Sequence, residues 1–199
     1  MTLFRVQNEV RHTLEIKKSQ FITWLKSVQS RQEAMAYLEQ AKQAYPDARH
    51  YCFAYVMGQS ANSMTAAMSD DGEPSGTAGK PMLNVLQHKP VCNVMAIVIR
   101  YFGGTKLGAG GLVRAYSQAV EQAYGLAQLE EIIETLAIKV QCDFAEEQWL
   151  RHQLSQVEGE IESVDYDQAV AFVLTLPKSQ ITPFCQQLDS RSIHYELKI

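Results

Sequence analysis

The chain has 199 residues, of which 46% are hydrophobic and 20% are charged, and its formal net charge at pH 7 is −4. This length suits one large or two small domains with ordinary hydrophobic cores. The negative net charge disfavours a dispersed, salt-driven grip on nucleic acid, although it leaves room for a local basic face. No run of about 18 apolar residues is present, and the start of the chain lacks a secretory signal. We therefore expect a cytoplasmic protein that has no membrane partner.

The first part of the chain predicts alternating strands and helices. Strands are expected at 15–28, 48–58 and 91–102, and the last of these is apolar enough to be covered on both faces. Helices are expected at 30–45, where Ser30 and Glu33 form a capping box, at 80–87, and from Gly110 to Ala123. The apolar faces of the first and last helices are predicted to consist of Ala34, Tyr37, Leu38, Ala41, Leu112, Ala115, Tyr116, Ala119, Val120 and Ala123.

From about Glu130 glycine becomes scarce and acidic residues increase. The predicted order there is strand, helix, strand, strand, helix, strand, at 135–142, 145–156, 160–165, 169–176, 177–188 and 192–197. A βαββαβ order of this length is typical of a ferredoxin-like sandwich. The fold class is therefore α+β, with one domain at 1–129 and a second at 130–199.

A glycine-rich run, "RYFGGTKLGAGGLVRAYSQAV" at 100–120, joins the buried strand to the helix after it. Glycines let a backbone turn sharply and approach a ligand, and the N-terminus of a helix favours an anion. The spacing matches neither a P-loop nor a dinucleotide-binding fingerprint. We expect RNA or phosphate to bind at Lys80, Arg100, Gly103, Gly104, Lys106, Gly108, Gly110, Gly111 and Arg114. The alternative is a tight connection in which the glycines serve packing alone.

An acidic loop, "SDDGEPSGTAGKP" at 69–81, precedes that run. Asp70, Asp71 and Glu73 can hold a hard cation with waters, or they can pair with Arg100, Lys106 or Arg114 and so order the glycine loop. We favour the pairing and expect neither a metal nor a cofactor. Hydroxyl and N–H groups that can bond to phosphate oxygens come from Ser75, Gly76, Thr77 and Gly79.

Catalytic signals are weak in this sequence. His50 stands just before a predicted strand and can act as a base, but no nucleophile signature accompanies it, so no catalytic residue is assigned. The four cysteines form no CxxC pair and are expected to be reduced core thiols. Tyr101 and Phe102 can either stack on bases or pack inside, whereas Tyr116 belongs to the core.

Three stretches, "SDDGEPSGTAGKPML", "VIRYFGGTKLGAGGLVRAYSQAV" and "PDARHYCFAYVMG", resemble the YigZ/IMPACT family over residues 17–123. The second domain resembles the bacterial YigZ branch by its position and element order. The resemblance implies a first domain with the fold of the second domain of small-subunit ribosomal protein five. It also implies a second domain like the fifth domain of elongation factor G. The family motif residues matched here are Asp70, Asp71, Gly72, Glu73, Pro74, Gly76, Thr77, Ala78, Gly79, Arg100, Tyr101, Gly103, Gly104, Leu107, Gly108, Gly110, Gly111, Leu112 and Arg114.

Three functions remain open at this point. The leading hypothesis, taken from the family's role in translational control, is a translation-associated regulator that binds RNA or a ribosomal partner through a glycine-rich basic cleft. The alternative is an enzyme that acts on a small phosphorylated or nucleotide-like substrate. A third is a docking module whose acidic second domain contacts a basic ribosomal or factor partner. We expect a binding protein rather than an enzyme, and the sequence does not fix the oligomeric state.

Overall fold

The computed structural model describes residues 3–58 and 64–198. The chain divides into two compact units, 1–132 and 133–199. The boundary predicted after residue 129 falls at the start of strand β7 (Leu129–Ile132), and β7 stays with the first unit because it pairs with strand β1 (Leu3–Val6).

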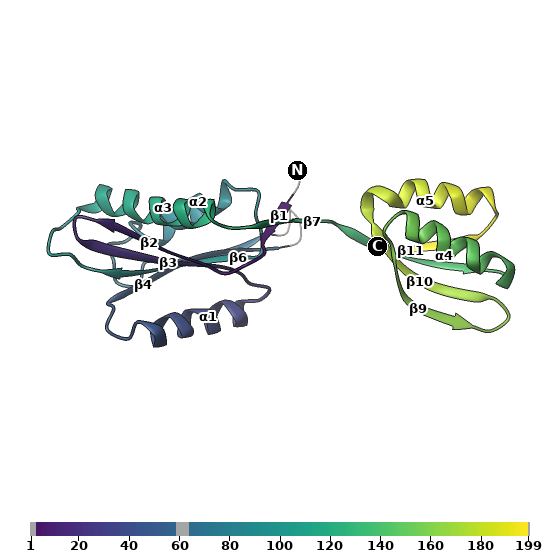
Figure 1. Cartoon of the computed structure of the whole chain (residues 1–199), viewed down its shortest axis with the longest axis horizontal. Coiled ribbons are helices and arrows are strands. Elements are labelled where there is room, and N and C mark those ends of the chain that lie inside the picture. The colour runs from purple at the N-terminus through teal and green to yellow at the C-terminus, as the bar shows by residue number, and fades with distance from the viewer. Residues whose placement is uncertain (1–2, 59–63, 199) are drawn as a thin grey trace. The chain divides into compact units, whose positions relative to one another are not determined.

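The first unit is built on a five-stranded antiparallel sheet, whose strands in spatial order are β2 (Val10–Ile16), β3 (Ser19–Ser27), β6 (Val94–Tyr101), β4 (His50–Met57) and β5 (Thr65–Ser69). Helices α2 (Gly79–Gln87) and α3 (Ala109–Gly125) cover one face, and α1 (Arg31–Ala44) covers the other (Figure 1). Strand β6 lies at the centre and is buried from Val94 to Arg100, which confirms the prediction of a strand covered on both faces.

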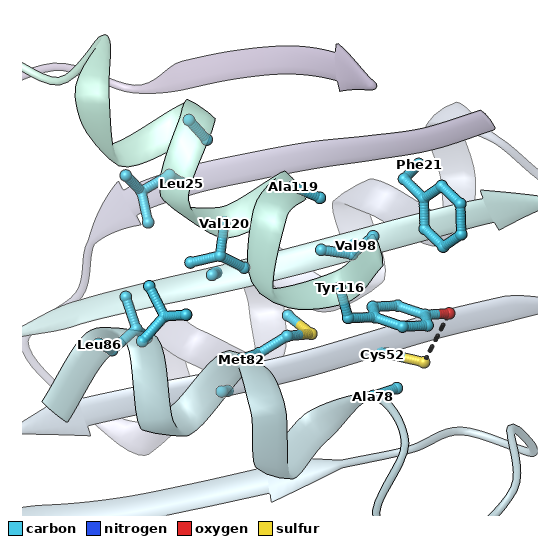
Figure 2. Close-up of a cluster of buried hydrophobic side chains, with 14 of the residues drawn as sticks. Phe21, Leu25, Cys52, Ala78, Met82, Leu86, Val98, Tyr116, Ala119 and Val120 are labelled. Carbon is cyan, nitrogen blue, oxygen red and sulfur yellow. Dashed lines mark hydrogen bonds between the residues drawn. The ribbon is translucent and has the colours of Figure 1, made fainter. Parts of the chain in front are cut away.

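The amphipathic helices bury the residues that their periodicity predicts. Every residue predicted for the apolar faces of α1 and α3 is buried. At the start of α1 the Ser30 Oγ accepts the Glu33 N–H at 3.1 Å, while the Glu33 carboxylate accepts the Gln29 N–H at 2.8 Å. Figure 2 shows the core between the sheet and helices α2 and α3, where Tyr116 packs edge-on against Phe21 with ring centroids 5.2 Å apart.

Sequence analysis did not predict strands β1, β2, β5 and β7, and the strand predicted at 15–28 is confirmed only as β3, at 19–27, because residues 15–18 belong to β2 and the turn after it. Strands β2 and β3 form a hairpin whose turn residues, Lys17 and Lys18, have φ values of 49° and 65°. Such turns usually carry Asn or Gly, so two lysines give no hairpin signal. Strand β5 has only five residues, TAAMS, without clear alternation. Strands β1 and β7 form their own two-stranded sheet from segments far apart in the chain.

The second unit has the predicted βαββαβ order. Its antiparallel sheet runs β11 (His194–Lys198), β8 (Thr135–Cys142), β10 (Val170–Pro177), β9 (Glu160–Tyr166), which is the strand order of a ferredoxin-like sandwich. Helices α4 (Glu147–Gln156) and α5 (Lys178–Ser190) pack on one face (Figure 1). The α+β, two-part fold predicted from the sequence is confirmed. Within the described residues no helix is long and apolar enough to cross a membrane.

Candidate functional site at the loop end of the first sheet

The loops singled out by the sequence meet at one end of the five-stranded sheet, which we call the loop end. Strand β6 finishes there, since Tyr101 lies opposite Gln20 of β3 and Arg100 lies opposite His50 of β4. Strand β5 also ends there at Ser69, opposite Phe53. The loop end therefore comprises the β2–β3 turn and the connections 70–78 and 102–108.

The glycine-rich connection is fixed against the β2–β3 turn. The Gly103 N–H donates to the Ser19 Oγ at 3.1 Å. A Cβ on Gly103 would lie 2.0 Å from the Lys18 carbonyl carbon, so only glycine fits this close approach. Gly104 and Gly108 have φ values of 89° and 73°, in the left-handed region. Backbone conformation and contact thus explain why the connection is rich in glycine.

Asp70 organises the acidic connection. One carboxylate oxygen accepts the Gly76 N–H at 2.8 Å, and the other accepts the N–H groups of Ala78 at 3.0 Å and Gly79 at 2.8 Å. These bonds satisfy N–H groups where α2 begins. Partial burial disfavours the charged form of Asp70, but the three N–H donors outweigh it and hold the pKa of this carboxyl below its ordinary value.

Asp71 and His50 also form hydrogen bonds that hold the acidic connection against strand β4. The Asp71 carboxylate accepts the Tyr51 N–H at 2.6 Å. His50 Nδ1 lies 2.9 Å from the Asp71 carbonyl oxygen, which can only accept, so Nδ1 carries the proton. The Thr77 hydroxyl donates to the Pro74 carbonyl at 2.6 Å. The phosphate contacts predicted for Thr77, and for the N–H groups that bond to Asp70, are therefore wrong, because these donors are used within the loop.

Glu73 and Arg100 form a buried ion pair beneath the loop end. The Arg100 Nη1 donates to the Glu73 Oε1 at 2.5 Å, and the side chains are only 8% and 3% exposed. The Tyr116 hydroxyl donates to the same oxygen at 2.8 Å, and the buried Cys52 thiol lies 3.4 Å from that hydroxyl (Figure 2). The predicted pairing with Arg100 is confirmed for Glu73 alone, since the carboxylates of Asp70 and Asp71 accept backbone N–H groups instead. Arg100 was also predicted to bind phosphate, and this is wrong because its charge is neutralised and buried.

The hydrogen bonds of Asp70 give a testable pH dependence. Because the pKa of Asp70 is depressed in the folded state, its stabilisation is fully present above the ordinary carboxyl pKa and is lost as pH falls through the lower folded value, below about pH 4. Asp70→Asn should therefore lower the free energy of unfolding of the first unit by about 1 kcal/mol at pH 7, because the neutral amide offers one acceptor oxygen to these three N–H groups. The difference from the parent should shrink in acid.

The tryptophans allow this measurement, since Trp24 lies in the first unit and Trp149 in the second. In a Trp149→Phe background, urea unfolding followed by Trp24 fluorescence reports the first unit alone. A stability difference of the same size at pH 7 and pH 3 would contradict the role given to the ionised carboxylate.

Five exposed cations surround the loop end: Lys17, Lys18, Lys80, Lys106 and Arg114. None of them forms an ion pair with any residue that the structure describes (no nitrogen lies within 4.0 Å of a carboxylate oxygen). Sequence analysis missed the first two because they were assigned to the interior of a strand. Lys17 and Lys18 lie near the cations of the glycine-rich connection because Gly103 packs directly against the backbone of the β2–β3 turn.

Helix α3 opens toward solvent at the loop end. Its N-cap is Gly108, which offers no side-chain acceptor, and Leu112 is the first residue whose N–H bonds back, to the Gly108 carbonyl. A Cβ on Gly110 would lie 3.6 Å from the Arg114 Nη1, so the Arg114 guanidinium lies over the first turn. The positive end of the helix dipole and this guanidinium together favour an anion.

The two aromatic residues at the end of β6 differ in their surroundings. The Tyr101 hydroxyl donates to Asp47 at 2.7 Å, and its ring packs near Tyr45 in the cluster on the α1 side. Phe102 is 57% exposed. Only Phe102 is therefore available for stacking on a ligand.

Two further features of the described residues can be compared with the loop end. Among residues 3–58 and 64–198, no three His, Cys, Asp or Glu side chains are grouped as metal ligands. A hollow of about 290 Å³ lies on the face of the second sheet that α4 and α5 do not cover, and its charged lining residues are of both signs: Lys139, Asp165 and Glu196. None of the predicted site residues lines it.

Comparisons with known proteins agree with this two-part architecture. The Impact N-terminal domain matches residues 17–124, and a domain of unknown function, DUF1949, matches residues 140–192. Escherichia coli YigZ is 39% identical over 87% of this chain and 85% of its own length. Bacillus subtilis YvyE is 36% identical over 92% of this chain and 83% of its own length. The chain belongs to the IMPACT family and is close to its bacterial YigZ and YvyE members.

One solved structure shows the same fold. The crystal structure of a hypothetical protein is 37% identical and superimposes with a TM-score of 0.72, covering 100% of this chain and 97% of that one. The two-domain translational regulator Yih1 aligns more distantly, with 22% identity over 60% of this chain and 46% of its own, at a TM-score of 0.35.

Proposed function

We propose that this chain is a translation-associated regulator that binds RNA, and that the loop end of the first unit contacts the RNA phosphates. One observation carries the proposal. Five exposed cations without ion-pair partners in the described structure lie together at the loop end of the first sheet, although the net charge of the whole chain is −4. Unpaired Lys and Arg side chains are free to neutralise phosphates and to release their counterions.

The neighbouring backbone supports the same ligand. Gly108, Gly110 and Gly111 leave the first turn of α3 without bulky side chains, so a phosphate oxygen can approach its free N–H groups. Arg114 supplies a guanidinium beside this turn. The buried Glu73–Arg100 pair orders the two connections from below. Arg100 therefore supports the proposed surface and does not contact the ligand.

The link to translation rests on the family resemblance given above, and it requires its own test. The four cysteines are free, buried thiols, which suits a reducing compartment, and we place the protein in the cytoplasm. Co-sedimentation of the full chain with ribosomes from a lysate tests the link. If the chain binds RNA in vitro but does not associate with ribosomes, the proposed RNA-binding surface stands and the proposed role in translation is contradicted.

The RNA-binding prediction concerns the double variant Lys106→Ala, Arg114→Ala. Binding of a short, unstructured, fluorescein-labelled RNA is followed by anisotropy between about 50 and about 200 mM salt. Affinity should fall steeply with salt for the parent chain. Loss of two phosphate contacts should weaken binding and reduce the slope of log K against log salt by about 1.4, at about 0.7 per contact.

The matched control is Arg31→Ala, Lys139→Ala, which removes the same charge from exposed positions outside the loop end. It should bind RNA as the parent does. Equal losses in both double variants would mean that net charge alone governs binding and would overturn the site. If a mononucleotide raises the thermal stability of the parent chain and RNA does not bind, the alternative function is favoured, namely an enzyme that acts on a small phosphorylated substrate.

A further inference from the structure

Phe102 is unusual among the aromatic side chains of the first unit. It is 57% exposed, and no other aromatic residue described in that unit reaches comparable exposure. The exposed aromatics of the second unit, Phe144 and Tyr166, stack on each other with ring centroids 6.5 Å apart and an interplanar angle of 16°. Phe102 has no such aromatic partner in the described structure. Single exposed apolar side chains are common on protein surfaces, so the exposure of Phe102 gains meaning only from the residues around it.

The backbone on both sides of Phe102 is fixed. Tyr101 before it ends β6 and bonds to Asp47 through its hydroxyl. Gly103 after it bonds to Ser19 and lies so close to the Lys18 backbone that a Cβ could not be accommodated. A ring held between two anchored residues loses little conformational entropy on binding.

A buried, paired cation lies near the ring, and exposed cations lie on the neighbouring connections. The Arg100 Cζ lies 5.9 Å from the Phe102 ring centroid and 5.5 Å from that of Phe21, so the buried guanidinium lies near both rings. The β2–β3 turn, which carries Lys17 and Lys18, meets the backbone at Gly103, next to Phe102. Lys106 belongs to the same connection. An exposed aromatic beside unpaired cations fits a ligand that offers both a π face and nearby negative charge.

We infer that Phe102 is a stacking platform for an unpaired base, and that the loop end prefers single-stranded RNA to duplex RNA. This inference rests on the proposed RNA-binding function and names the form of RNA that is bound. In a duplex the base faces are covered by their neighbours, so Phe102 would gain nothing, whereas a single strand exposes bases that stack on aromatic side chains. The cations would hold the phosphates on either side of the stacked base.

The experiment compares three labelled RNAs by anisotropy at one salt concentration. These are a short unstructured strand, the same strand in a duplex, and a strand of the same length in which abasic sites replace the bases but the phosphates remain. The parent chain should bind the first more tightly than the other two. Phe102→Ala should weaken binding of the intact single strand about tenfold and change binding of the duplex and abasic RNAs less than about twofold.

Phe102→Trp should keep or raise the single-strand affinity, because indole retains a stacking face. The matched control is Phe144→Ala, since Phe144 has a similar exposure of 55% in the second unit, and it should change nothing. Unaltered single-strand binding by Phe102→Ala, combined with loss in Lys106→Ala, Arg114→Ala, would overturn the stacking platform and leave the proposed function intact. Equal loss on all three RNAs would also overturn it. Failure of the parent to bind any RNA at low salt would overturn the proposed function itself.

Discussion

Glu73→Gln is expected to lower the free energy of unfolding of the first unit by about 3–5 kcal/mol at pH 7. The substitution hardly changes the volume of the side chain, so no cavity contributes to the loss. It does remove the negative partner of Arg100, whose side chain is only 8% exposed. A buried guanidinium without a counter-ion bears its desolvation cost uncompensated. Urea unfolding followed by Trp24 fluorescence in the Trp149→Phe background measures the effect.

Two further variants separate the ion pair from other causes. Glu130→Gln removes an exposed ion pair of the same unit, Glu130 with Arg5, and should leave the unfolding curve unchanged. Adding Arg100→Gln to Glu73→Gln should restore part of the lost stability, since no charge then remains buried. If Glu73→Gln is as stable as the Glu130→Gln control, the buried Glu73–Arg100 pair does not stabilise the first unit, and the prediction is wrong.

Gly103→Ala is the second substitution with a large expected effect, a loss of about 3 kcal/mol in the first unit. The added Cβ would meet backbone atoms at 2.0 Å from the Lys18 carbonyl carbon and 2.2 Å from the Ser19 nitrogen, and backbone cannot rotate away as a side chain can. The glycine-rich connection must therefore move off the β2–β3 turn. RNA affinity should fall with stability, because the move separates Lys17 and Lys18 from Lys106.

The adjacent glycine provides the control. Gly104 has a φ of 89°, but no atom lies within 4 Å of the position of an added Cβ. Gly104→Ala should therefore cost only the strain of a left-handed conformation, about 1–2 kcal/mol. The same Trp24 measurement applies to both variants. If the two variants are equally stable, the backbone around Gly103 can move aside without loss of stability, and Gly103 does not anchor the connection to the β2–β3 turn.

The sequence predicted elements well where the signal is local. The spacing of Leu112, Tyr116 and Val120 is a helical period, and α3 buries all three. Ser30 and Glu33 mark the start of α1 by a capping pattern that needs no tertiary information. Strands β1 and β7 depend instead on pairing between residues 3–6 and 129–132, which no local pattern reveals.

The candidate site was predicted only in part, and Arg100 shows why. A glycine-rich run with a basic residue suggests an anion site, and most of the predicted cations are indeed exposed at the loop end. Alternation along β6 places Arg100 on the same face as Val98, which packs in the core under α3. Whether a charge on that face is tolerated depends on finding Glu73 opposite, from a loop elsewhere in the sequence. The burial of Arg100 against Glu73 depends on tertiary structure. From its residue type alone, Arg100 is expected to be exposed and to bind an anion.

The pairing of β1 with β7 has a consequence for synthesis on the ribosome. The five-stranded sheet and its three helices are complete once residue 125 has emerged. Residues 3–6 leave the ribosome before this sheet is made, and Phe4 can bond to Pro90 and Cys92 once these emerge, but the paired strand at 129–132 appears only after the whole sheet. This early segment is therefore fully paired only when β7 has emerged, as one of the last steps in the folding of the first unit.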